Sequence, residues 1–297
     1  MAAFSKKTNL VHNITYMAIM TAINVIFIVL DRFVPFLILL LILFLPLCSA
    51  LVSYFCLKRY YIIYAVASIG LCAIFEPFDT IFYIVPAICT GFLIGVLLDM
   101  KINPFWMILS STLVEIALSY AFIPLINLIG NTDIVTSFLT IFRLNDFAFK
   151  EELMHLFILF IALMQCSLTH FVLLTEIKKI GIETNTQVAS YGPYIIGLLV
   201  SLLIGLIFAL TYTPPSLAFI ALSFYFAVFL LIDIIQSKRA IIYIISGVLF
   251  LVAAALFVVF FSKITKQLGF TLFGLFSLSI GMTSFVNNYL LKGQGNI

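Results

Sequence analysis

Apolar runs of about 20 residues follow one another along almost the whole chain, and only short polar segments separate them. A run of this length is what an α-helix needs to cross the hydrocarbon core of a bilayer. The sequence is 64% hydrophobic and 9% charged, whereas a soluble domain carries roughly 25% charged residues. So few charges cannot cover a surface that faces water. The sequence therefore predicts an all-α fold, a polytopic bundle of transmembrane helices with no separate aqueous domain.

About ten segments are predicted to span the membrane, with boundaries uncertain by about two to four residues. The first is not expected to be a cleaved signal, because it lacks a small-residue cleavage site and Thr15, Thr21 and Asn24 interrupt its apolar core. The predicted spans are 13–30, 34–57, 60–75, 80–99, 104–129, 152–177, 193–212, 214–235, 240–261 and 269–291.

The basic residues indicate an orientation, because short cytoplasmic loops carry an excess of Lys and Arg. With the N-terminus inside, ten of the 15 Lys and Arg residues fall on the inner side and five on the outer side. This asymmetry predicts an even number of helices with both termini cytoplasmic, in the cell membrane. A polar segment at 177–192 is the best candidate boundary between two modules, a six-helix module at 1–180 and a four-helix module at 181–297.

Several motifs of enzymes are missing. The sequence contains no phosphate-binding loop of the G-x-x-x-x-G-K-[ST] type, no H-E-x-x-H and no G-x-S-x-G. The five cysteines lie in apolar runs without a C-x-x-C pair, so neither a disulfide framework nor a zinc site is indicated. We therefore expect no enzyme activity, no metal, no cofactor and no nucleic-acid partner. Uphill transport driven by ATP would need another subunit to hold the nucleotide.

The string "KEELMHLF" is the most enzyme-like part of the sequence. Glu152 and His155 stand three residues apart, as metal ligands on one helix face do, and paired glutamates that open a membrane helix resemble the CPBP-type intramembrane proteases. That family has an arginine where Leu156 stands here, and a second E-x-x-H is missing. The alternative is that Glu151 and Glu152 occupy a first helical turn, where the helix dipole favours negative charge.

Glu115 lies 11 residues after Pro104, so about 17 Å along a helix that crosses a core about 30 Å thick. An ionisable residue near mid-membrane usually faces a bundle interior or a cavity. Gln165 lies 11 residues before Glu176, and we expect it at a similar depth. The pair is interpreted either as part of a solute site or as a structural hydrogen bond between helices.

The outer ends of the third to sixth spans collect polar residues where a ligand from outside would first meet the protein. Besides Glu115 and Gln165, the candidate substrate-binding residues are Glu76, Tyr83, Tyr120, Asn127 and His155.

Two patterns of small residues carry a resemblance to a known family. "AIMTA" holds Ala18 and Ala22 four residues apart, and "PAICTGFLIGVLLDM" holds Gly91 and Gly95. With six predicted helices and both module ends inside, residues 1–180 resemble the substrate-binding S components of energy-coupling-factor (ECF) vitamin transporters. The longer chain is similar to the YybS-like predicted membrane proteins. The four additional helices and the lack of a vitamin-specific signature depart from the S components.

The resemblance implies a function and partners. Ala18 and Ala22 would dock against the transmembrane T component of such a transporter, Gly91 and Gly95 would pack helices together, and the outer residues would bind a small solute. An ATPase subunit would supply energy. Alternatives are internal packing of Ala18 and Ala22, a non-transporting scaffold whose four C-terminal helices dock partners, and an intramembrane enzyme that uses Glu152 and His155.

Overall fold

The computed structural model describes residues 6–7, 9–33, 37–130, 133, 136, 140, 150–179, 191–211, 213–237, 240–261 and 266–291. These residues form helices and short connections, and no strand occurs among them. The helices, in chain order, are α1 (Leu10–Phe33), α2 (Leu37–Phe55), the 3₁₀ turn η2 (Lys58–Tyr60), α3 (Tyr61–Phe75), α4 (Pro77–Asp79), the π-helical turn η3 (Thr80–Ile84), α5 (Val85–Asp99), α6 (Pro104–Gly130), α8 (Lys150–Lys179), α9 (Tyr191–Thr211), α10 (Thr213–Ser237), α11 (Ala240–Phe261), α12 (Lys266–Phe285) and the π-helical turn η4 (Val286–Leu291).

Seven helices of the described part of the chain are long and apolar enough to cross a membrane. Phe44–Phe55 and Ile244–Ala253 are shorter apolar helices. The chain is therefore a helical protein of the multi-pass membrane type, and every predicted span overlaps a helix. The seven are Leu10–Leu30, Lys58–Phe75, Pro77–Asp99, Pro104–Gly130, Met154–Ile177, Gly192–Ala209 and Pro215–Ile232.

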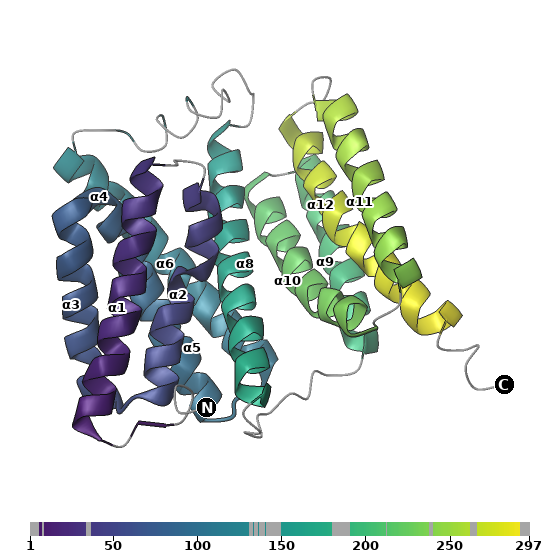
Figure 1. Cartoon of the computed structure of the whole chain (residues 1–297). Coiled ribbons are helices and arrows are strands. Elements are labelled where there is room, and N and C mark those ends of the chain that lie inside the picture. Colours follow the sequence, from purple (N-terminus) through teal and green to yellow (C-terminus); the bar gives the residue numbers. More distant parts are fainter. Residues whose placement is uncertain are drawn as a thin grey trace. The chain divides into compact units, whose positions relative to one another are not determined.

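The contacts divide the chain into two compact units (Figure 1). Unit 1 comprises Met1–Phe138 and Ile161–Gln187, and unit 2 comprises Leu139–Phe160 and Val188–Ile297. Helix α8 thus contributes its first part to unit 2 and its second part to unit 1. The division into modules at residue 180 stays a prediction.

The contact between α2 and α5 in unit 1 depends on glycine. A methyl group added to Gly91 would collide with the backbone carbonyl of Pro46 and with Ser49. A methyl group added to Gly95 would lie 2.6 Å from Cβ of Ser53, closer than carbon atoms approach one another. Small residues let membrane helices approach closely and gain dispersion contacts along their backbones. Gly91 and Gly95 therefore lie directly in the α2–α5 interface.

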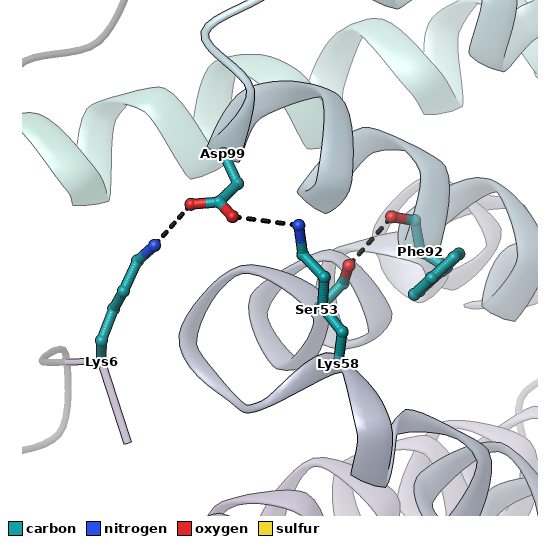
Figure 2. Close-up of polar contacts among 5 residues, drawn as sticks. All are labelled: Lys6, Ser53, Lys58, Phe92 and Asp99. Carbon is teal, nitrogen blue, oxygen red and sulfur yellow. Dashed lines mark hydrogen bonds and ion pairs between the residues drawn. The ribbon is translucent and has the colours of Figure 1, made fainter. Parts of the chain in front are cut away.

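Hydroxyl groups tie the same two helices together. Ser49 donates a hydrogen bond to the carbonyl oxygen of Ile88 at 2.8 Å, and Ser53 donates to that of Phe92 at 2.9 Å (Figure 2). Tyr61 of α3 also donates to Ile88 at 2.7 Å, and its hydroxyl contacts that of Ser49. The helix carbonyls of α5 thus use their second lone pairs for side chains from two other helices.

Three segments distant in the sequence meet at one end of unit 1. Lys6 and Lys58 both pair with Asp99, the last residue of α5 (Figure 2). Nζ of Lys58 lies 3.0 Å from Oδ2 of Asp99. Exposed ion pairs of this kind contribute only about 0–1 kcal/mol each. They nevertheless bring together segments that the charge pattern assigns to the same side of the membrane.

Buried hydrogen bonds hold the N-terminal segment at that end. The Asn13 amide is buried and donates to the carbonyls of Lys7 (3.1 Å) and Asn9 (2.8 Å). Its oxygen accepts from the backbone N–H of Leu57 at 2.8 Å. The backbone N–H of Lys7 donates to the carbonyl oxygen of Phe55 at 2.7 Å. Asn13 therefore links the start of α1 to the end of α2.

Unit 2 packs α9, α10 and α12 around aromatic and small residues. The Tyr194 ring of α9 stacks on Phe229 of α10, with centroids 4.9 Å apart. Ser223 of α10 and Ser277 of α12 share a buried hydrogen bond of 2.9 Å. This unit thus has its own apolar core and its own interhelical hydrogen bond.

The α2–α5 contact generates a prediction about glycine substitutions. Gly91→Ala or Gly95→Ala is expected to destabilise the protein by about 1–3 kcal/mol, as overpacking in a filled interior does. Gly70→Ala is the matched control, because a methyl group at Gly70 meets nothing within 4 Å. It should leave the melting temperature of the purified chain in detergent unchanged or raise it, since alanine is the better helix former. If Gly91→Ala and Gly70→Ala melted alike, the close contact would not exist.

Candidate functional site: a buried polar seam in unit 1

The interior face of α6 carries Glu115. Its side chain is 6% exposed, and Ser111 and Thr112, within about one turn of it, are also buried. On other sides of α6 the large apolar side chains of Trp106 and Leu113 are exposed. Because residues three and four apart share a helix face, Ser111, Thr112 and Glu115 lie on the buried side of this helix, together with the apolar Met107 and Ile108.

The neighbours of Glu115 come from α5 and α8. Cys89 and Thr90 of α5 lie close to the carboxyl group, and so does Cys166 of α8. Thr90 donates its single hydroxyl proton to the carbonyl of Pro86, its own helix, at 2.8 Å. The same hydroxyl group also interacts with the Glu115 carboxyl group, whose Oε2 has no partner among the described residues.

Several polar atoms of this region have no hydrogen-bond partner among the described residues. On α6 they are Oε2 of Glu115, Oγ of Ser111 and Oγ1 of Thr112. On α8 they are Oγ of Ser167 and Oγ1 of Thr169, which follow Cys166 in the sequence. A buried polar group left unpaired costs about 1–3 kcal/mol, so a group of them calls for an explanation such as a ligand. We call these five residues the polar seam.

Gln165 is 2% exposed and lies next to Cys166 on α8. The hydrogen bonds of the described residues do not include one between Gln165 and Glu115. An interhelical bond between the Gln165 amide and the Glu115 carboxyl group therefore does not account for the burial of Glu115.

The five outer residues that the sequence suggested as substrate-binding lie on several different elements. Glu76 links α3 to α4 and Tyr83 lies in η3, and both are half-buried. On α6, Tyr120 is 38% exposed and Asn127 is half-buried. His155 is exposed, and its contacts assign it to unit 2, whereas the other four belong to unit 1.

Ala18 and Ala22 are both exposed on α1. Neither side chain is buried against the described residues of unit 1. Among the described residues, no group of three His, Cys, Asp or Glu side chains lies close enough to hold a metal ion. The side chain of Glu152 lies outside the described residues.

Sequence reasoning found Glu115 but missed its surroundings. Ser111, Thr112 and Glu115 share a helical period, which signals one polar face. The contribution of Thr90 and Cys166 depends on how α5 and α8 pack, and no local pattern reports it.

Comparisons of the chain with protein-family models, with curated proteins and with solved structures find no significant match.

The unpaired carboxyl generates a prediction about stability. Glu115→Leu is expected to melt within about 1 kcal/mol of the wild type, because among the described residues its carboxyl group interacts only with the Thr90 hydroxyl and Oε2 has no partner. Asn13→Leu is the contrasting variant, because it removes three hydrogen bonds between the Asn13 amide and the backbone and should lose about 1–3 kcal/mol for each backbone group left buried without a partner. Both are measured by thermal unfolding of the full chain in detergent. A loss in Glu115→Leu as large as that in Asn13→Leu would mean that the carboxyl is a structural link.

Proposed function

We propose that this chain is the substrate-binding membrane subunit of an ATP-driven uptake transporter of the energy-coupling-factor type, specific for a small solute such as a vitamin. The observation that carries this proposal is the polar seam around Glu115, in the interior of a unit whose other helices expose apolar side chains. Burying such a carboxyl group inside a membrane protein has a large desolvation cost. Intramembrane ionisable residues commonly mark substrate or ion pathways.

The other parts of the proposal follow from the sequence. The chain has no phosphate-binding loop, so a separate ATPase subunit would supply the energy. The proposed location is the cell membrane, with ten spans and both termini in the cytoplasm, and the excess of Lys and Arg in the predicted inner loops supports it. The residues of unit 1 would bind the solute and would not transform it.

The exposed face of α1 is proposed to dock the T component of the transporter. Ala18 and Ala22 present small side chains, which allow another helix to approach closely. Ala18→Leu and Ala22→Leu should fold normally and copurify with less of a membrane partner than the wild type. The control is Ala218→Leu on exposed α10 surface. Equal partner recovery in all three variants would refute docking at this face.

The same exposed face favours a second candidate function, a non-transporting scaffold that organises membrane partners. A scaffold would need the docking face but would not need a solute at Glu115. The two functions therefore differ in whether a small molecule travels with the protein.

Mass spectrometry of small molecules extracted from the purified chain tests the proposal. We expect a solute in roughly equimolar amount in the wild type and in Asp133→Asn, a carboxylate-to-amide change at an exposed position. In Glu115→Gln the solute should be lost while the melting temperature of the protein without solute stays unchanged. Absence of any solute from the wild type, or equal retention in Glu115→Gln, would contradict the transport proposal and favour the scaffold.

A further inference from the structure

The charge balance around Glu115 restricts what can bind there. Among the described residues, no Lys, Arg or His pairs with its carboxyl group. Its described neighbours are the thiols of Cys89 and Cys166 and the hydroxyl of Thr90. None of these carries a positive charge, so an anionic group of a ligand would meet a carboxylate without a compensating cation. A positive group would instead meet the one charge that the seam offers.

The unpaired atoms of the seam match the needs of such a group. Oε2 of Glu115 and the hydroxyl oxygens of Ser111 and Thr112 are buried and without partners among the described residues. All three can accept hydrogen bonds from an ammonium group, and carboxylate and hydroxyl oxygens are also hard ligands for a small metal cation. Ser111 and Thr112 stand four and three residues before Glu115 on α6, so each of them shares a helix face with Glu115.

The strength of such a contact follows from the surroundings. Two opposite unit charges attract more strongly in an apolar interior than in water, because little solvent screens them. A buried carboxylate without a partner is unfavourable for the same reason. A bound cation would therefore neutralise Glu115 and satisfy the hydroxyl groups beside it in one step.

We propose that Glu115, with Ser111 and Thr112, binds a positively charged group, either a monovalent metal ion or the protonated amine of an organic solute. This inference rests on the proposed function, because it names the chemical class of the ligand at the same site. Both sources share one chemistry, a single positive charge that oxygen atoms coordinate.

The experiment follows the melting temperature of the full chain in detergent against the concentration of three chloride salts at matched ionic strength. Sodium represents the metal ion, ethylammonium represents the amine, and tetrabutylammonium is a bulky cation whose nitrogen has no N–H group to donate. Ligands that bind only the folded state raise its stability in a saturable way. We expect a saturable rise with sodium or with ethylammonium and none with tetrabutylammonium, and the salt that acts identifies the source.

The variants decide whether the effect belongs to Glu115. Glu115→Gln, which keeps the shape and removes the charge, should weaken the apparent affinity about tenfold or more, as loss of a desolvated charge partner does. Asp133→Asn should keep the wild-type response. The absence of a saturable rise in the wild type, or an unchanged response in Glu115→Gln, overturns the inference.

The outcome is separable from that of the transport proposal. An extracted solute that is neutral or anionic, and that Glu115→Gln loses, would refute the cationic ligand and leave the transport proposal intact. A cation response that depends on Glu115, in a protein from which no solute can be extracted, would support the cation site and refute solute capture.

Discussion

The close contact between α2 and α5 is the interaction on which the rest of unit 1 depends. Gly91 and Gly95 allow the backbone of α5 to approach α2 closely, and Ser49 and Ser53 then reach its carbonyl groups. Successive residues of a helix point about 100° apart. With Gly91 held against α2, its neighbour Thr90 is therefore directed to a different side of α5, and it lies beside Glu115 of α6. The glycine contact in this way fixes one wall of the polar seam.

Two regions of unit 1 treat buried polar side chains differently. Between α1 and α3, Thr21 shares a hydrogen bond of 3.0 Å with Ser68, and the Asn24 amide donates to the Tyr64 hydroxyl at 2.9 Å. These bonds link helices to one another, as polar groups in an apolar medium generally do. On α6 and α8, by contrast, the atoms without partners include Oε2 of Glu115 and the hydroxyl groups of Ser111, Thr112, Ser167 and Thr169. Oδ1 of Asn24 is also without a partner among the described residues. What sets the second region apart is that one of its unpaired atoms belongs to a carboxyl group, and this is the reason to assign that region to a ligand.

The sequence allowed the helices to be located for two reasons. Each apolar run must be long enough to cross a bilayer, and its backbone N–H and C=O groups must hydrogen-bond to one another, as they do in a helix. The predicted break between the third and fourth spans, for example, falls where Glu76 adopts an extended backbone before Pro77. The lateral arrangement could not be predicted in this way. An almost uniformly apolar helix such as α5 does not indicate from its composition which side faces a neighbour.

The parts that could not be predicted are those that depend on packing between distant segments. The pairing of Lys6 with Asp99 joins residues 93 positions apart, and no local pattern reports such a contact. The grouping of His155 with unit 2 likewise depends on where the first part of α8 packs. The burial of Glu115, in contrast, followed from its depth in an apolar run, because a charge at mid-membrane is unfavourable in contact with lipid.

Infrared difference spectroscopy of the Glu115 carboxyl group tests the central claim most directly, because it observes the group itself. The carboxyl signal would be assigned by its loss in Glu115→Gln. Spectra of the purified chain would then be compared before and after addition of the stabilising cation or the extracted solute. The account predicts that this signal changes on ligand addition in the wild type and in Asp133→Asn. A Glu115 signal that is the same with and without ligand would contradict the account and leave the carboxyl group as a buried structural residue.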